Sequence, residues 1–294
     1  EGAKKAQAEI PAVNEWRIDP YLFFADAFDI QGLGRPDFTT LNGSRIYYSH
    51  IDGDAFGGIS LIDRSSLNGE MMMQRVLKDL GLPISISYVT LDVEKRLDDK
   101  YSRELAVAQK ILELPNVEPA CHTFSHPFNW VKGDLGLDDS KPGEYVLIRK
   151  DIDLEKEVVH AVDFVDKLSP PNKRCRILLW SGKCNPPARA IELVRELGII
   201  NMNGGESFID EAEPLLGGVA PLIGEVHGEI QFHVSAAGDF HYTNSWTGPY
   251  DGMKNLPAYL ERTDKPRRLR CMNVYYHFYL AEREPGIEGL DAAY

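Results

Sequence analysis

The sequence predicts an α/β fold in which a parallel sheet closes, or nearly closes, into a barrel. Strand-like apolar runs alternate with helical patterns along the chain, which implies parallel strands joined by right-handed crossovers. The seven predicted strands lie near residues 45–50, 84–91, 117–121, 176–181, 199–203, 230–234 and 272–280. Seven such units favour a barrel over an open doubly wound sheet. No helix opens with Gly-x-Gly-x-x-Gly, which argues against a dinucleotide site.

Glycine and proline mark the ends of the predicted helices. The helices cover residues 68–80, 99–114, 153–168 and 186–197. Gly81 and Gly198 follow two of them, and Pro115 and Pro170 end the other two. Asn185 is predicted to cap the start of the last helix.

Length and charge limit the organisation of the chain and its partners. With 294 residues, 43% of them hydrophobic, the chain can form one large α/β domain. We expect an N-terminal extension over residues 1–44 that wraps a barrel domain formed by residues 45–294. The net charge of −13 argues against nucleic acid as a partner, and no apolar run is long enough for a membrane span. The chain starts without Met, which we interpret as an excised part of a longer protein.

Two short clusters that follow predicted strands carry metal-ligand chemistry. Asp52-Gly-Asp54 follows the first strand, and His122-x3-His126 follows the third. Asp54, His122 and His126 are predicted to bind one divalent ion, Zn²⁺ in the first place, with Co²⁺ or Ni²⁺ as alternatives. Asp52 is left to accept a proton from water. If the segment after residue 121 opens a helix, both imidazoles lie on one face, one turn apart.

Further polar and aromatic residues follow the later strands. Trp180 and Asn185, after the fourth strand, line a pocket in one interpretation and are a core side chain and a helix cap in the other. Asn203, after the fifth strand, is either a substrate ligand or part of a plain turn. Thr123 and Ser125 are candidates for hydrogen bonds that orient the imidazoles, or for helix caps.

Aromatic residues surround a single histidine on the last strand. His277 shares one face of this strand with Tyr275, and it is either a general acid or a satisfied core group. The strand is expected beside the first one, which carries Asp52. Trp246 lies in a loop of aromatic and small polar residues, a composition that stacks on sugar rings or simply covers the end of a barrel.

Together these motifs resemble the polysaccharide deacetylases of the carbohydrate esterase 4 type. The strings that begin at Ser49, His122, Trp180 and Val274 are most similar to the deacetylase domain of Pel exopolysaccharide biosynthesis proteins, over about Trp16 to Ala281. Gly53 departs from the usual pair of adjacent aspartates, and two usual motifs, Arg-x-x-Pro-Tyr and Asp-x-x-Asp-Trp, are missing.

This resemblance implies both a fold and a function. The fold is an incomplete barrel of seven β/α units. The activity is metal-dependent N-deacetylation of an exopolysaccharide rich in N-acetylgalactosamine and N-acetylglucosamine, during synthesis of a biofilm matrix in the periplasm. Asp52 is then the base and His277 the acid, and Trp180, Asn185, Asn203, Trp246 and Tyr275 contact the substrate. The implied partners are a preceding glycoside hydrolase domain and other exopolysaccharide secretion components.

Two other classes of function remain open on the sequence. A small-molecule amidohydrolase would carry His-x-His after the first strand and two metal ions, but this chain has Asp-Gly-Asp there. A catalytically inactive carbohydrate-binding or assembly module would not need the complete ligand set and the spare carboxylate.

Overall fold

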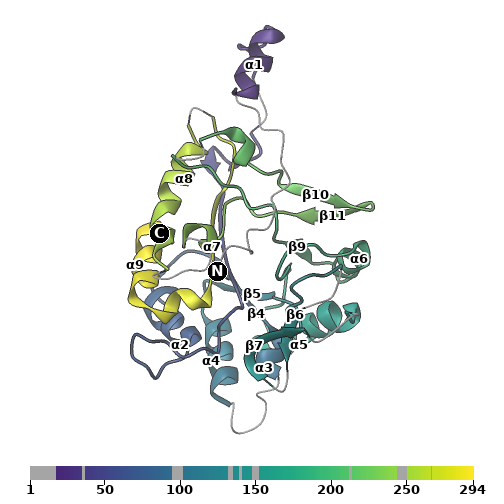
Figure 1. Cartoon of the computed structure of the whole chain (residues 1–294), viewed down its shortest axis with the longest axis vertical. Helices are drawn as coiled ribbons and strands as arrows, with labels where there is room; N and C mark the ends of the chain where they lie inside the picture. The colour runs from purple at the N-terminus through teal and green to yellow at the C-terminus, as the bar shows by residue number, and fades with distance from the viewer. Residues whose placement is uncertain are drawn as a thin grey trace, which may run out of the picture.

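The computed structural model describes most of the chain. The described residues are 18–34, 37–94, 102–131, 135–138, 141–147, 152–211, 214–243, 250–265 and 267–294. Of the predicted extension over residues 1–44, only 18–34 and 37–44 are therefore covered. They include helix α1 (Pro20–Ala27), which projects away from the barrel in Figure 1. The division at residue 44 stays a prediction.

A six-stranded parallel sheet forms the centre of the molecule (Figure 1). In spatial order its strands are β12 (Met272–His277), β3 (Tyr47–Asp52), β4 (Ile84–Tyr88), β5 (Val117–Cys121), β8 (Ile177–Leu179) and β9 (Ile200–Met202). These strands are mostly apolar and buried, as expected for a parallel sheet covered on both faces. Because β12 and β9 are left as edges, the described sheet is an incomplete barrel, which confirms the predicted fold class.

The predicted strand at residues 230–234 is a strand, but it does not belong to the barrel sheet. It is β11 (Glu229–Phe232), which pairs antiparallel with β10 (Ile223–Val226) in a separate hairpin. His227 and Gly228 form the turn, both with positive φ (49° and 88°), as a two-residue type I′ hairpin requires. This tight turn pairs β11 with β10, the strand that precedes it in the sequence, and not with the barrel sheet. The prediction of a seventh barrel strand at residues 230–234 is therefore wrong. Two further hairpins pair β1 (Thr40–Leu41) with β2 (Ser44–Arg45), and β6 (Leu135–Asp138) with β7 (Lys141–Leu147).

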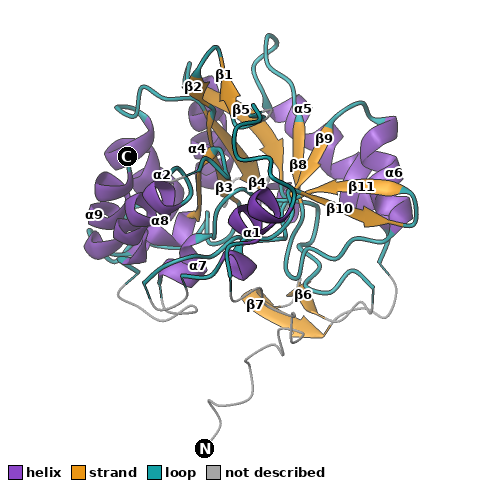
Figure 2. Ribbon diagram, turned by 90° about the horizontal axis from the view of Figure 1, so that it is seen from above, coloured by secondary structure: helices purple, strands orange, loops and turns teal. Residues whose placement is uncertain are grey.

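Helices cover both sides of the sheet (Figure 2). On one side lie α2 (Asn68–Met72), which continues as the π-helical turn η1 (Met73–Leu77), α4 (Ser102–Glu113), α8 (Leu256–Arg262) and α9 (Glu284–Ala293). On the other lie α5 (Ala161–Leu168), preceded by the π-helical segment η3 (Glu155–His160), and α6 (Ala188–Glu196). The shorter helices are α3 (Thr90–Glu94), α7 (Asp239–Tyr242), η4 (Leu216–Gly218), η5 (Gly252–Asn255) and η6 (Phe278–Glu282).

Two of the predicted helix ends differ from the structure. Gly81 and Gly198 take left-handed conformations, with φ of 62° and 70°. Gly198 directly follows the C-cap of α6, whereas Gly81 lies beyond a short turn, because the first helix ends at Leu77 and not at residue 80 as predicted. Asn185 does not cap α6, because the helix starts two residues later than predicted and its N-cap is Pro187. The Asn185 side chain is engaged elsewhere, as described below.

Two apolar clusters stabilise the barrel from its two sides. The larger one packs α2, η1, α4 and α9 against the sheet and includes Ile51, Ile86, Leu77, Leu112 and Leu290. The second packs η3, α5 and α6 against β5 and β8 and includes Val158, Val165, Leu178, Trp180 and Val194. The four cysteines are free. Among the described residues, no helix has the length and apolar character needed to cross a membrane.

Candidate metal and catalytic site

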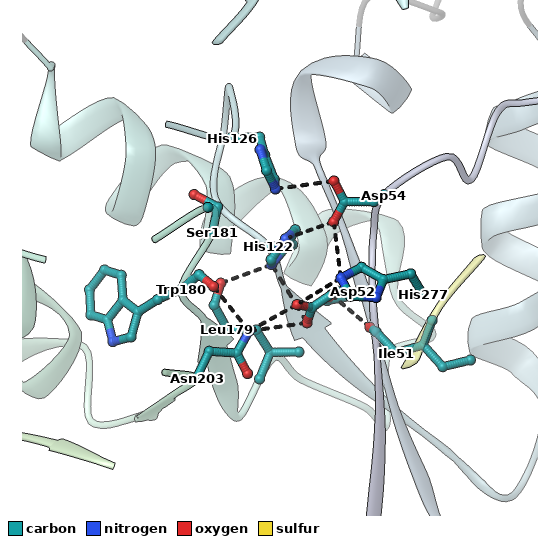
Figure 3. Close-up of polar contacts among 12 residues, drawn as sticks. Ile51, Asp52, Asp54, His122, His126, Leu179, Trp180, Ser181, Asn203 and His277 are labelled. Atoms are coloured by element: carbon teal, nitrogen blue, oxygen red, sulfur yellow. Dashed lines mark hydrogen bonds and ion pairs between the residues drawn. The ribbon is translucent and has the colours of Figure 1, made fainter. Parts of the chain in front are cut away.

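The five predicted catalytic and metal-binding residues come together at the carboxyl ends of the barrel strands (Figure 3). Asp52 ends β3, His277 ends β12, and these two residues are direct partners in the register of the two strands. The expectation that the last strand lies beside the first is therefore confirmed. His122 directly follows β5. In a parallel sheet the carboxyl ends meet at one edge, where binding and catalytic groups usually lie.

Asp54, His122 and His126 form a compact set of ligand-type atoms. His122 Nε2 lies 3.2 Å from one carboxylate oxygen of Asp54, and His126 Nε2 lies 3.1 Å from the other. All three ligand atoms lie within 4.8 Å of one another. His122 Nδ1 is 3.0 Å from the carbonyl oxygen of Leu179, the type of second contact that orients a metal-binding imidazole. Two imidazoles and one carboxylate with room for further ligands fit a catalytic divalent ion.

The loop His122–His126 is not helical, contrary to the helix start considered from the sequence. Thr123 and His126 take left-handed conformations, with φ of 65° and 55°. The two imidazole centroids are 4.9 Å apart. A tight loop, rather than one helical turn, therefore brings both imidazoles to Asp54.

Gly53 permits the approach of two strands. Its φ is not in the left-handed region. A Cβ at this position would lie 2.6 Å from the backbone nitrogen of Val89 and 2.8 Å from Cα of Tyr88. A glycine is therefore required at this position because the turn after β3 packs directly against the end of β4. A positive φ is not the reason.

Asp52 is buried and held by two hydrogen-bond donors. Asn203 Nδ2 lies 2.9 and 3.2 Å from its two oxygens, and Tyr275 donates its hydroxyl at 2.8 Å. The nearest nitrogens of His122 and His277 are 3.8 and 3.7 Å away. Asn203 and Tyr275, predicted as substrate ligands, thus orient this carboxylate. Their contact with substrate stays a prediction.

His277 has a buried carboxylate partner that the sequence did not indicate. Its Nδ1 is 2.8 Å from Asp239, which also accepts the backbone N–H of His277 and the hydroxyl of Tyr279. Its Nε2 faces the site, 3.7 Å from Asp52 and 3.8 Å from Asp54. Burial alone would lower the pKa of His277, but the charge and hydrogen bond of Asp239, with the charges of Asp54 and Asp52, raise it to about 9.

The electrostatics of the ligand set favour a cation. Burial would raise the pKa of Asp54, yet His126 and His122 hold it well below its usual range, so Asp54 is ionised. Burial would lower the pKa of His122, but Asp52 and Asp54 outweigh this effect and raise it.

A pocket of about 440 Å³ opens over these groups. It is lined by all five predicted catalytic and metal-binding residues, and also by Trp180 and Tyr275. Phe128, Glu206 and Phe240 line it too, although sequence reasoning did not select them. Burial, with the nearby charge of Asp52, raises the pKa of Glu206.

Trp180 and Asn185, two further residues predicted to contact substrate, use their side chains in contacts with other parts of the fold. The Trp180 side chain is fully buried, and its Nε1 donates to Asn201 at 3.0 Å, as in the core interpretation. Asn185 accepts from the backbone of Trp130 and donates to Asn129, both at 3.2 Å. Trp246 lies outside the described residues. The substrate contacts proposed for these three residues stay predictions.

Neither hydroxyl between the two histidines contacts an imidazole in the hydrogen bonds described. Ser125 donates to Glu157, a buried residue of η3. The Thr123 side chain is fully buried. Glu157 and Asp239 were both missed in the sequence. The only signal for Asp239 is its place after the small-residue run that follows β11, and Glu157 looks like any acidic residue near a helix start.

Comparison with known proteins finds similarity only to solved structures. No family model matches the chain, and no curated protein matches it. A 4-alpha-glucanotransferase from Thermococcus litoralis is similar over 83% of this chain and 36% of its own, with 12% identity and a TM-score of 0.48. A GH57 branching enzyme from Thermococcus kodakaraensis is similar over 84% of this chain and 67% of its own, with 10% identity and a TM-score of 0.44. A GH57-type branching enzyme from Pyrococcus horikoshii is similar over 84% of this chain and 66% of its own, with 10% identity and a TM-score of 0.43.

These comparisons correct the predicted function. These three structures are carbohydrate-active enzymes named for glucan transfer and branching, and none of the three is named as a deacetylase. The prediction of N-deacetylation of a Pel-like exopolysaccharide is therefore contradicted. The chain spans about a third of the glucanotransferase and about two thirds of the branching enzymes. At identities of 10–12% and TM-scores below 0.5, neither transfer nor branching is carried over to this chain.

Proposed function

We propose that this chain is a metal-dependent hydrolase that binds one divalent ion through Asp54, His122 and His126. The observation that supports this most is the convergence of two imidazole nitrogens, at 3.1 and 3.2 Å, on the two oxygens of one ionised carboxylate. Zn²⁺ suits this mixed nitrogen and oxygen set, and Co²⁺ and Ni²⁺ are the alternatives. Such an ion, when bound, lowers the pKa of a coordinated water and polarises the bond under attack.

Two side chains of the protein then carry out the two proton transfers of the reaction. Asp52, fixed by Asn203 and Tyr275, accepts the proton of the attacking water. His277, whose ring is fixed by Asp239 and carries a proton at neutral pH, donates to the leaving group. Both groups line the same pocket as the ligand set, so they reach a substrate bound there.

A second candidate is cleavage of a glycosidic bond by a pair of carboxyl groups. The observation in its favour is Glu206, whose pKa is raised by burial and by the charge of Asp52, as in a general acid. In this alternative Glu206 and Asp52 do the chemistry, and no metal ion is needed. Asp54 and the two imidazoles have no role in it, which is why we rank it second.

One experiment separates the two candidates. The purified protein is stripped with a chelator and reloaded with Zn²⁺, and its metal content and its hydrolysis of an aryl ester, an aryl phosphate and an aryl glycoside are measured. We expect one tightly bound ion per chain and a hydrolysis that needs it. Asp54→Asn, His122→Ala and His126→Ala should each lose the ion without unfolding, because these ligands lie beyond the strand ends.

The result that overturns the metal-dependent proposal is equally clear. Full metal occupancy in any one of the three variants would exclude that residue as a ligand. Cleavage of the glycoside that is insensitive to chelator and lost in Glu206→Gln would favour the second candidate. The periplasmic location, the preceding glycoside hydrolase domain and the secretion partners rest on the resemblance alone and stay predictions.

A further inference from the structure

The loop that carries both histidine ligands is held by a buried carboxylate that the reaction above does not use. One oxygen of Glu157 accepts the backbone N–H groups of Phe124 and Ser125, at 3.0 and 2.8 Å. The other oxygen accepts the hydroxyl of Ser125. The Glu157 side chain is fully buried. Its hydrogen bonds therefore lie in a low-dielectric region, where bonds to a charged acceptor are strong.

The opposite edge of the loop is fixed by a different element. The backbone N–H groups of Thr90 and Leu91, in the first turn of α3, donate to the carbonyl oxygens of Thr123 and Phe124 at 3.1 and 2.9 Å. The loop therefore lies between two helical segments. The backbone N–H groups of α3 donate to its carbonyl oxygens, and the carboxylate of Glu157 in η3 accepts from its N–H groups.

A side chain of the loop packs against the same helical segment. The Phe124 ring is 5% exposed. It lies 4.2 Å from the ammonium of Lys156, measured to the ring centroid, and 5.5 Å from the ring of His160. The residues on either side of Glu157 therefore also define where the loop lies.

The loop conformation needs such support. Thr123 and His126 are held with φ of 65° and 55°, a region that non-glycine residues rarely occupy and that is costly for a β-branched side chain. Without external hydrogen bonds the chain would gain by leaving this conformation, and the two imidazoles would no longer converge on Asp54. A buried carboxylate is itself costly unless its hydrogen bonds repay the loss of hydration.

We infer that Glu157 is the positioning residue of the metal site: it fixes the His122–His126 loop and so sets the affinity for the ion. The inference rests on the proposed metal-dependent function, but it concerns the chain's own loop and not the reaction. Glu157 touches neither substrate nor ion in this role. It acts only through the backbone and hydroxyl groups of the two residues between the ligands.

The test measures Co²⁺ binding to metal-free protein by calorimetry, together with the visible spectrum of the Co²⁺-loaded form. The variants are Glu157→Ala, Glu157→Gln and Ser125→Ala. The matched control is Glu155→Gln, because Glu155 lies two residues away in η3 with an exposed side chain. Loss of an outer partner of a metal ligand typically weakens binding about 10- to 100-fold, and we expect this for Glu157→Ala.

The conservative variants distinguish positioning from general stability. Glu157→Gln keeps acceptor and donor groups that can satisfy the loop, so it should restore most of the affinity and the wild-type spectrum. Ser125→Ala removes a single hydrogen bond and should weaken binding less than Glu157→Ala. Glu155→Gln should bind like the wild type. Thermal unfolding of each metal-free variant shows whether it is folded.

Each outcome decides a different question. If the wild type binds no Co²⁺, the proposed function fails, and the inference fails with it. If the wild type binds and Glu157→Ala, folded, binds equally well with the same spectrum, the inference alone is wrong. If Glu157→Ala does not fold, Ser125→Ala decides, and wild-type affinity with an unchanged spectrum in that variant would overturn the positioning role.

Discussion

Asp52 and Asp54 lie two residues apart, yet their neighbours suit them to different tasks. Asp54 faces two imidazoles, at 3.1 and 3.2 Å, which is the environment of a metal ligand. Asp52 faces an amide and a phenol hydroxyl, and the nearest imidazole nitrogen is 3.7 Å away. Both oxygens of Asp52 accept from these neutral donors, which orients the carboxylate toward the pocket as expected for a general base. This contrast at the residue level gives the first prediction.

Asp52→Asn should keep the metal ion and lose activity. The amide oxygen can still accept from Asn203 and Tyr275, so the local structure should persist, but the general base is gone. The expected loss is roughly 10²- to 10⁴-fold in kcat. Metal stoichiometry and turnover are measured on the same preparation. An empty metal site in this variant would show that Asp52 is a ligand, and the assignment of the two aspartates would have to be revised.

His277→Ala should make the rate depend on the leaving group. The ring of His277 is held by Asp239 with Nε2 toward the site, as expected for a group that protonates the departing atom. Substrates with a good leaving group do not need this proton and should be spared, whereas those with a poor leaving group should be slowed strongly. A series of aryl substrates of graded leaving-group pKa measures this. Equal losses across the series would rule out His277 as the acid.

At the level of elements, the approach of two strands decides where Asp54 lies. Gly53 sits where the turn after β3 meets the end of β4, and a Cβ there would come within 2.6 Å of the Val89 backbone nitrogen. Backbone atoms cannot give way as a flexible side chain can. One strand end would therefore have to shift, and Asp54 would shift with it.

Gly53→Ala should destabilise the fold by roughly 1–3 kcal/mol, the usual cost of overpacking, and weaken metal binding. Gly32→Ala is the matched control, because a Cβ at Gly32 meets nothing within 4 Å and its φ is not left-handed. That variant should stay within about 0.5 kcal/mol of the wild type. Urea unfolding and metal titration of both variants check the prediction. Wild-type stability and affinity in Gly53→Ala would show that the strands can separate without cost.

The sequence predicted the elements better than the contacts between them. The six barrel strands could be recognised in the sequence because they are buried on both faces and end in turns. The motif residues could be recognised because they lie at or directly after the ends of these strands. β11 was misplaced because apolar pattern alone does not tell a barrel strand from a hairpin strand. The turn at His227 and Gly228 decides that.

The contacts that the sequence did not reveal join residues that are remote in sequence. Asp52 meets Asn203 across 151 positions, Asp239 meets His277 across 38, and Glu157 meets Ser125 across 32. Each pair forms only when helices and strands pack in three dimensions. No local periodicity encodes such a pair, so Asp239 and Glu157 look like surface residues in the sequence.

At the scale of the whole molecule, the proposed ion joins parts of the chain that the sheet keeps apart. Asp54 follows β3, and the two histidines follow β5, with β4 between these strands. The ligand set exists only when all three strands are in place. A bound ion therefore stabilises the folded state over the unfolded chain by mass action.

Metal loading should raise the melting temperature of the wild type. At a free ion concentration of 100 times Kd the gain is about 2.7 kcal/mol. At roughly 2–4 °C per kcal/mol for a chain near this size, the expected shift is about 5–10 °C. Scanning calorimetry with Zn²⁺ and with chelator measures it. The net charge of −13 attracts cations unspecifically, so His126→Ala serves as the control, since it keeps that charge but lacks one ligand. An equal shift in His126→Ala would mean that the ions stabilise the acidic surface and not the site formed by Asp54 and the two histidines.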